Sequence, residues 1–474
     1  MLHIPLDLDR AGAGPLYQQL YEGLAGQIRT GAIPAGGRLP GKRTLAAELS
    51  LSVNTVDTAY QMLAAEGYVE SRPRSGFVVL PFTDILPGGP ANAGASPLPP
   101  PPAADPQPPV RFDLRTGGVD TALFPFRTWG RIQKDLLYSA PELLAHGAPQ
   151  GDAPLRRALA AYLAAYRGVR CTPEQIVVGA GLEYLLGLLG PLLGGVCAVE
   201  DPGYASPRTI LENSGIRCRP VPVDRGGLSV AALAESGADR CYVTPSHQFP
   251  TGVTMPAPRR AELLRWAAAG PGRRYILEDD YDSEFRFDLK PLPCLQGMAG
   301  ADGPVIYLST VSKSLAPSIR IAYMVLPAGL LPDWKDRYGA YANTVSRFEQ
   351  ETFCRFLEEG YFTRHLARMR NTCKARRNAL VEALYGAFGR QGVRLTGLHT
   401  GLHLLLTLPD GPGEAAMTRQ ARAAGVRLTG LSAYYAGGAG GCPPNTVLLG
   451  YGALRPEDAP VLARTLKEAW RPTA

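Results

Sequence analysis

A lysine flanked by hydroxyl groups is the feature of this sequence that most directly suggests covalent chemistry. Lys313 lies in the stretch STVSKSLAPSIR, preceded by Thr310 and Ser312 and followed by Arg320. A lysine amine can form a Schiff base with a carbonyl compound. The two hydroxyls and the guanidinium can bind a phosphate. Because most lysines are solvated surface groups, this interpretation needs support from the rest of the chain.

An acid and a tyrosine follow an apolar run elsewhere in the sequence. Residues 275–277 are apolar and lead into Asp279, and Tyr281 comes two residues later. The pattern predicts a buried strand with Asp279 at its carboxyl end, which is where open α/β sheets bind ligands. A carboxylate at that place can hold a protonated ring nitrogen, and the phenol of Tyr281 can pair with a ring hydroxyl.

A turn that contains two glycines, GAGLE at 179–183, stands between a strand pattern at 176–178 and a helix pattern at 182–193. Backbone amides at the N-terminus of a helix bind phosphate groups well. A plain loop is the alternative for such a turn taken alone. The amides expected to face a phosphate are those of Gly181, Leu182 and Glu183.

These groups together match the needs of pyridoxal 5′-phosphate (PLP). This cofactor requires a lysine for its Schiff base, an acid that keeps the pyridine nitrogen protonated, a partner for the ring hydroxyl and a cationic phosphate site rich in amides. The sequence therefore predicts PLP as the cofactor. Lys313 is the expected covalent ligand, Asp279 the partner of the pyridine nitrogen and Tyr281 the partner of the ring hydroxyl.

In order and content these stretches resemble fold-type I PLP enzymes of the aminotransferase class over residues 111–474. The stretches EDPGY at 200–204 and TPSHQFPTG at 244–252 add to the resemblance. It implies that Tyr204 stacks on the pyridine ring and that His247 assists Tyr281 at the ring hydroxyl.

Two positions depart from the aminotransferase pattern. Phe249 stands where aminotransferases have an asparagine that touches the ring hydroxyl. The stretch VLLGY at 447–451 lacks the arginine that pairs with a substrate carboxylate in those enzymes. Arg208 is a weak substitute for that arginine in substrate binding. Sustained transamination of α-amino acids is therefore not expected, although a half-reaction remains open.

The first 80 residues predict helices followed by a hairpin, the pattern of a winged helix-turn-helix. Leucine or isoleucine every four residues predicts a helix at 15–29. A short helix at 45–49 and a second helix that begins at residue 54 are predicted next, and residues 68–79 are predicted to form two strands. In such modules the start of the second helix reaches base edges, and nearby basic groups contact phosphates or the minor groove. The expected DNA-binding residues are Lys42, Arg43, Asn54, Thr55, Thr58, Arg72 and Arg74.

The pattern of residues from Leu39 to Val69 resembles the GntR-type winged-helix family. Val53 and Asp57 depart from it, because the family commonly has basic residues at these positions. The operator sequence can therefore not be carried over from the family. Residues 1–80 carry seven basic and seven acidic side chains, so the expectation of DNA binding rests on where the basic groups lie and not on net charge. A winged helix used for protein contacts is the alternative.

A proline-rich stretch divides the chain. Residues 81–110 contain eleven prolines, which excludes the interior of a helix or sheet. We expect a multi-domain protein: a winged helix-turn-helix head (α+β) at 1–80, a linker at 81–110 and an α/β body of the fold-type I aminotransferase kind at 111–474. Within the body, a large lobe is expected at about 111–385 and a small C-terminal α+β lobe at about 386–474.

Joined in one chain, head and body resemble the MocR-type (GabR-like) regulators. The resemblance implies a PLP-dependent transcription regulator that binds double-stranded promoter DNA as a homodimer, arranged head to tail as in that family. Its body would sense PLP, or a small amino compound that joins PLP as an external aldimine. The alternative is an active class I/II aminotransferase with an accessory DNA-binding head. Effector, operator and the direction of regulation remain open.

Composition adds limits. The eight cysteines include no Cys-x-x-Cys pair, so reduced thiols and no metal site are expected. No apolar run reaches the roughly 20 residues of a membrane span, and the N-terminal residues lack a secretory pattern. A cytoplasmic protein without a membrane partner is expected.

Overall fold

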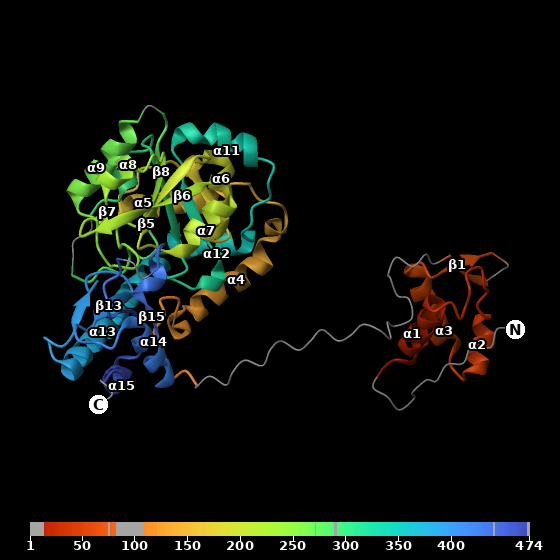
Figure 1. Ribbon diagram of the computed structural model, residues 1–474. Helices are drawn as coiled ribbons and strands as arrows, with labels where there is room; N and C mark the ends of the chain where they lie inside the picture. Colours follow the sequence, from red (N-terminus) through yellow and green to blue (C-terminus); the bar gives the residue numbers. More distant parts are fainter. Residues whose placement is uncertain are drawn as a thin grey trace. The chain divides into compact units, whose positions relative to one another are not determined.

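The computed structural model describes residues 14–73, 76–81, 109–118, 120–270, 272–288, 292–438 and 441–471. The chain divides into two compact units, Met1–Asp105 and Pro106–Ala474 (Figure 1). Each unit has hydrophobic clusters of its own. Most of the expected linker, together with Arg74, lies outside the described residues.

The described residues of the head form three helices and a two-stranded antiparallel hairpin, as the sequence predicts. The core contains Leu20, Leu24, Val56 and Leu63, all fully buried. The first helix of the helix-turn-helix begins three residues before its predicted start, and the second begins one residue before. The elements are α1 (Leu16–Arg29), α2 (Lys42–Glu48), α3 (Val53–Ala65), β1 (Val69–Arg72) and β2 (Gly76–Val79).

The second unit is built on an eight-stranded sheet with the order β4-β11-β10-β9-β8-β5-β6-β7. The five strands from β10 to β6 run parallel, while β11, β4 and β7 join as antiparallel neighbours. The apolar run at 275–277, predicted as a buried strand, lies in β9. The strands are β4 (Ile176–Gly179), β5 (Val196–Asp201), β6 (Arg217–Asp224), β7 (Gly227–Leu228), β8 (Arg240–Val243), β9 (Tyr275–Asp279), β10 (Val305–Thr310) and β11 (Ala322–Val325).

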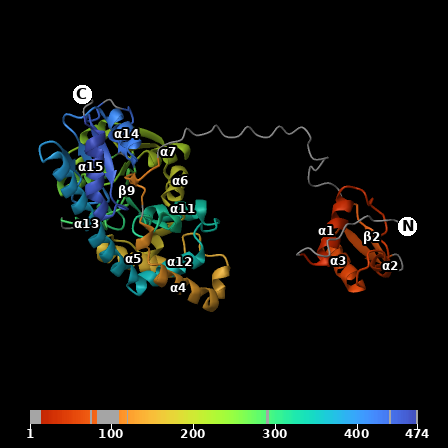
Figure 2. The same ribbon diagram turned by 90° about the horizontal axis from the view of Figure 1, so that it is seen from below.

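Helices cover both faces of this sheet, which is why its central strands are buried on both sides (Figures 1 and 2). On one face lie α6 (Leu182–Leu193), α7 (Ala205–Asn213) and α11 (Leu331–Tyr338). On the other lie α4 (Phe126–Ser139), α5 (Ala153–Arg167), α8 (Val230–Glu235), α9 (Ala257–Ala268), α10 (Leu295–Ala299) and α12 (Arg347–Glu358).

A smaller four-stranded sheet follows the long helix α13 (Tyr361–Phe388). Its order is β12-β13-β16-β15, with all neighbours antiparallel. The short strand β3 (Phe112–Asp113) pairs with β14 (Val426–Arg427), so the start of this unit contacts its C-terminal part. The remaining elements are β12 (Arg394–Thr396), β13 (His403–Thr407), β15 (Thr429–Gly430), β16 (Thr446–Gly450), α14 (Glu414–Ala423) and α15 (Ala459–Ala469).

Among the described residues, no helix combines the length and the apolar character that crossing a bilayer requires. All eight cysteines are free thiols. Within the same described part, no group of three or more His, Cys, Asp or Glu side chains is arranged to hold a metal ion.

Candidate functional site

The carboxyl ends of β9 and β10 open on a cavity of about 350 Å³. Nine of the residues proposed from the sequence line it: Leu182, Glu183, Tyr204, Asp279, Tyr281, Thr310, Ser312, Lys313 and Arg320. The rest of the wall comes from Thr116, Gly117, Thr244, Phe249, Asp282, Pro317, Leu402 and His403. The fold therefore brings together residues that are widely separated in the chain.

Lys313 follows β10 in a tight turn, and its side chain lies in the cavity wall. Its Nζ donates a hydrogen bond to the backbone carbonyl of Thr116. Burial lowers the pKa of Lys313 below its ordinary value of 10.5, and Asp282 opposes this shift. A lower pKa leaves more of the amine in its neutral, nucleophilic form. The environment of Lys313 therefore suits a covalent ligand of a carbonyl group.

Asp279 ends β9 and is buried, with one oxygen that has a partner and one that has none. The hydroxyl of Tyr242, on the neighbouring strand β8, donates to Oδ2. Oδ1 has no hydrogen-bond partner among the described residues. Burial raises the pKa of Asp279 to about 7, although the hydrogen bond from Tyr242 lowers it. A buried carboxylate with a free oxygen in a cavity wall fits a cationic N–H group, such as a protonated pyridine nitrogen.

Tyr281 reaches the cavity with His247 behind it. The Tyr281 hydroxyl donates to the backbone carbonyl of His247 at 3.0 Å and lies 3.0 Å from its Nδ1. That Nδ1 also lies 2.9 Å from Oδ2 of Asp282. His247 is not part of the cavity wall. Its contacts hold the Tyr281 hydroxyl from behind the wall, an arrangement compatible with the assisting role expected for His247.

The expected phosphate site lies at the N-terminus of α6. Arg320 Nη2 donates to Oε2 of Glu183 at 2.7 Å and to the carbonyl of Ala180 at 3.1 Å. A Cβ on Gly181 would stand 2.1 Å from this Nη2, so only glycine lets the guanidinium approach. Burial raises the pKa of Glu183, but hydrogen bonds from Arg320 and from its own amide lower it overall. A bound phosphate would replace the Glu183 carboxylate as the anion at this helix end.

Two other parts of the phosphate site carry hydroxyls and amides. Thr310 Oγ1 and Ser312 Oγ lie 2.8 Å apart, as expected for two groups that could share one phosphate oxygen. The amide of Gly181 donates to the carbonyl of Gly179 at 2.8 Å. It therefore differs from the expected arrangement, in which this amide faces the phosphate.

An aromatic group forms the remaining wall. The Phe249 ring packs edge-on against Tyr204, His403 and Tyr434, with ring centroids 5.4, 5.2 and 4.9 Å away. Burial, followed by the nearby His247, holds the pKa of His403 well below 6.5, so His403 is neutral at pH 7. Sequence reasoning missed His403 and Tyr434, because nothing local marks them as neighbours of the cavity.

Arg208, the weak candidate for a substrate carboxylate, does not line the cavity. It forms an ion pair with Glu212, one turn later on α7, at 3.1 Å, and both side chains are exposed. The structure therefore gives Arg208 a surface contact and supplies no reason to connect it with the site.

On the head, the expected DNA-reading residues lie at the start of α3. Ser52 caps this helix by accepting from the amide of Thr55 at 3.0 Å, and the two hydroxyls lie 2.8 Å apart. The Thr58 hydroxyl donates to the carbonyl of Asn54 at 2.9 Å. The side chain of Asn54 is exposed, so it is the residue of this group that is most available to a base edge.

The basic residues of the head differ in their contacts. Lys42 forms an ion pair with Asp57, which lowers the pKa of that carboxyl. Arg72 in β1 forms an ion pair with Glu70 on the same strand. Arg43 is exposed. Binding of phosphates by Lys42 and Arg72 would therefore compete with internal carboxylates, a cost that the sequence did not reveal.

Residues 16–79 match the family model described as bacterial regulatory proteins, gntR family, and residues 113–439 match that of aminotransferase class I and II. An uncharacterized HTH-type transcriptional regulator YdeL of Bacillus subtilis (strain 168) is 37% identical over 96% of this chain and 97% of its own length. The probable rhizopine catabolism regulatory protein MocR of Rhizobium meliloti is 34% identical over 95% of this chain and 93% of its own. The chain belongs to the MocR-type transcriptional regulators.

Solved structures resemble the body of this MocR-type regulator. LysN, an α-aminoadipate aminotransferase from Thermus thermophilus complexed with N-(5′-phosphopyridoxyl)-L-leucine, matches 76% of this chain and 91% of its own, with 27% identity and a TM-score of 0.65. The family and fold predicted from the sequence are confirmed. The chain is a DNA-binding transcription regulator with a body of the PLP-dependent aminotransferase type. The regulators match nearly the whole chain and the aminotransferases only its body, which favours a regulator over a working aminotransferase.

Proposed function

We propose that this MocR-type regulator binds PLP covalently at Lys313 and that a small amine at the same site changes how the head engages promoter DNA. The unpartnered Oδ1 of buried Asp279, in the same cavity wall as Lys313, carries the proposal. A buried carboxylate oxygen without a partner is costly unless a ligand supplies one. The protonated ring nitrogen of PLP is such a partner.

The residues of the cavity divide among the parts of the cofactor. Asp279 would hold the pyridine nitrogen, Tyr281 the ring hydroxyl, and the half-exposed ring of Tyr204 would stack on the pyridine. When bound, PLP supplies an electron sink. The phosphate would be held by Thr310, Ser312, Arg320 and the amides of Leu182 and Glu183. The proposal includes a DNA-binding head at 1–80, a linker at 81–110 and a PLP-binding body at 111–474. It also includes a cytoplasmic location, where the protein would meet its DNA.

The charge of the wall indicates the kind of amine. Among the described wall residues, the only cations are Lys313 and Arg320, and both are assigned to the cofactor. His403 is neutral, and the space beside Phe249 is aromatic. A carboxylate brought there would lose water without gaining a cation. We therefore propose that the effector is an amine without a carboxylate.

Matched pairs of compounds test this proposal. Phenethylamine and phenylalanine differ only in the carboxylate. We expect phenethylamine to perturb the visible spectrum of the PLP-loaded protein at a concentration at least ~10-fold lower, since an unpaired buried charge costs more than about 1.4 kcal/mol. Equal or stronger effects of phenylalanine would contradict the amine proposal. Product formed well beyond one equivalent per chain would instead indicate an active aminotransferase.

DNA binding tests the regulatory part. The wild-type protein selects duplexes from a random pool, and fluorescence anisotropy then gives its affinity for the selected duplex with no addition, with PLP, and with PLP plus phenethylamine. We expect PLP with the amine to change the affinity relative to PLP alone. If PLP alone changes the DNA affinity and the amine adds no further change, PLP itself is the effector. An affinity that is the same in all three conditions would refute the regulatory proposal.

Homodimerisation belongs to the same proposal. Four large apolar side chains on and just after α4 are exposed in the single chain: Phe126 (64%), Leu137 (66%), Tyr138 (82%) and Leu144 (80%). Exposed large apolar side chains grouped in one short stretch of the chain are typical of an interface. A head-to-tail dimer that covers this face is the arrangement implied by the family resemblance, and sedimentation of wild-type protein beside Leu137→Glu tests it.

Arg72→Ala is expected to weaken DNA binding through one lost phosphate contact. Each phosphate contact contributes about 0.9 to the slope of log affinity against log salt, so the slope should fall by roughly that amount. Arg29→Ala, at the end of α1, is the matched control and should leave the slope unchanged. Anisotropy titrations at several salt concentrations give the slopes. If the slope for Arg72→Ala equals that of wild type, Arg72 of β1 does not contact a DNA phosphate.

A further inference from the structure

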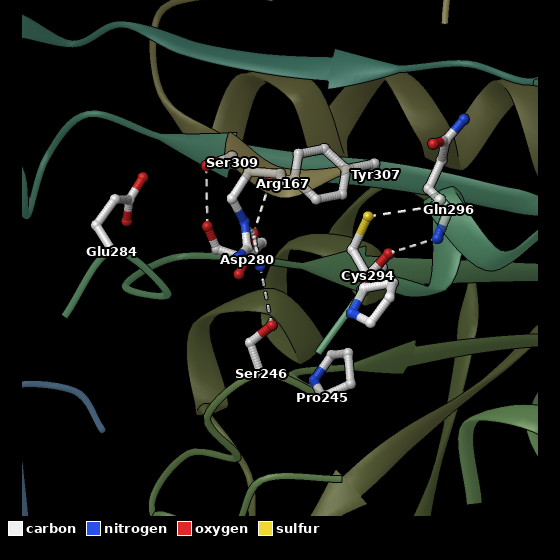
Figure 3. A network of polar contacts seen from close by, with 12 residues as sticks. Arg167, Pro245, Ser246, Asp280, Glu284, Cys294, Gln296, Tyr307 and Ser309 are labelled. Carbon is white, nitrogen blue, oxygen red and sulfur yellow. Dashed lines mark hydrogen bonds and ion pairs between the residues drawn. The ribbon is translucent and has the colours of Figure 1, made fainter. Parts of the chain in front are cut away.

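A buried ion pair lies directly behind the cofactor-facing residues of β9. Arg167, the last residue of α5, donates through Nε to Oδ2 of Asp280 at 2.6 Å (Figure 3). The side chains of Arg167 and Asp280 are only 3% and 1% exposed. Neither residue lines the cavity. Its hydrogen-bond partners Asp280 and Ser246 lie outside the cavity wall as well, so Arg167 can act on the site only through its neighbours.

Those neighbours are the residues next to the site. Asp280 lies between Asp279 and Tyr281 in sequence. Nη2 of the guanidinium, which also lies 2.6 Å from Oδ2 of Asp280, donates to Oγ of Ser246 at 3.2 Å, and Ser246 directly precedes His247. One planar cation therefore connects the loop after β9 with the loop after β8. Asp279, the partner expected for the ring nitrogen, ends β9 just before the first of these loops, and the two loops carry Tyr281 and His247, the pair expected at the ring hydroxyl.

Strand β10 completes the connection. The Tyr307 hydroxyl donates to Oδ2 of Asp280 at 2.5 Å, and the Ser309 hydroxyl donates to the Asp280 carbonyl at 2.9 Å (Figure 3). The same strand leads into the turn of Lys313. Asp280 is thus held from α5 and from β10 at once, so its backbone, and with it the position of Asp279, has little freedom.

The pair remains charged in spite of its burial. Burial raises the pKa of Asp280, but Arg167 and Tyr307 together bring it below the ordinary value. Glu284 nearby has its pKa raised to about 7 by burial and by the charge of Asp280. A buried ion pair contributes little net stability compared with apolar residues of the same size. Its value here lies in fixed geometry, because a guanidinium directs its donors in set directions.

We propose that Arg167 is a positioning residue that sets the orientation of Asp279 and of the Tyr281–His247 pair toward the cofactor. This inference rests on the proposed PLP site. It assigns to a residue outside the cavity a measurable part in cofactor binding. Loss of the pair should leave the fold in place and let the two loops shift independently.

The double variant Arg167→Met/Asp280→Asn tests the proposal without leaving a lone buried charge. We expect at least ~10-fold weaker PLP binding and altered circular dichroism of the visible band, which reports the orientation of the bound ring. The matched control is Arg347→Met/Asp152→Asn, which removes an ion pair of 2.8 Å at the other end of α5. That control should lower the melting temperature and leave affinity and circular dichroism unchanged.

The outcomes are separable. If wild-type protein shows no visible band with PLP, the proposed function fails before Arg167 is examined. If wild type binds PLP and the folded double variant has the same affinity and circular dichroism, the inference is overturned, whatever its melting temperature. If the double variant does not fold, Ser246→Ala removes only the contact with the loop after β8. It should shift both readouts in the same direction by a smaller amount, and no shift overturns the proposal.

Discussion

Lys313→Ala, incubated with PLP and then separated from unbound cofactor by gel filtration, is expected to lack the visible Schiff-base absorbance band that wild-type protein shows after the same treatment. The band requires the covalent link between cofactor and lysine, and alanine has no amine. The lowered pKa of Lys313 favours this link in the wild type, because burial keeps a larger share of the amine neutral at pH 7. The expected loss is therefore complete and not partial.

Controls separate loss of the link from loss of the fold. Lys335→Ala removes an exposed lysine of α11 and should keep the band. Borohydride reduction of PLP-loaded wild type, followed by peptide mass spectrometry, should find the cofactor mass on the peptide that contains Lys313. A band that persists in folded Lys313→Ala would show that another lysine is the ligand.

Much of this site could be predicted because its signals are local. The apolar run before Asp279 predicts a buried strand with the acid at its end, and β9 ends at Asp279 as expected. The turn before Leu182 predicts the start of a helix, and α6 spans the predicted residues. Such patterns depend on neighbours within a few positions, which a single sequence contains in full.

Other parts were not predictable, because they depend on contacts between distant residues. The amine of Lys313 donates its hydrogen bond to the carbonyl of Thr116, which lies 197 positions earlier in the sequence. Tyr242 stands in an apolar run, which indicates no more than a strand, and only the parallel pairing of β8 with β9 places its hydroxyl on Asp279. Arg167 at a helix end carried no signal at all. Nothing in local spacing indicates which buried acid such an arginine will meet.

The head illustrates the same limit. The existence of its helices and hairpin follows from apolar periodicity, but α2 begins three residues before its predicted start, since Lys42 and Arg43 carry no apolar signal. The ion pair between Lys42 and Asp57 joins two helices of the motif. Because of this ion pair, Lys42 must break its contact with the Asp57 carboxylate before it can bind a DNA phosphate. Only the tertiary structure reveals this contact.

Asp279→Ala is expected to weaken PLP binding by roughly 10²- to 4 × 10³-fold. Removing one partner of a buried charge pair costs about 3–5 kcal/mol, and every ~1.4 kcal/mol is tenfold in affinity. Tyr242→Phe is the matched control, because it keeps the carboxylate and removes only the hydrogen bond to it. It should weaken binding by about tenfold. Equilibrium titration monitored by the visible band gives all three affinities.

Although Asp279→Ala should weaken cofactor binding, it should stabilise the cofactor-free protein relative to wild type at high pH. The pKa of Asp279 is raised from 3.8 to about 7 in the fold, so its neutral form is favoured there. Stability linked to this group is present below the unfolded pKa and is lost as pH rises through the folded one. Above pH 7, wild type therefore carries a buried charge that Asp279→Ala lacks. The melting temperature of the variant relative to wild type should rise between pH 5.5 and 8.5. If the difference in melting temperature between variant and wild type stays constant or falls over this pH range, Asp279 is not the buried carboxylate of raised pKa on which the proposed cofactor site depends.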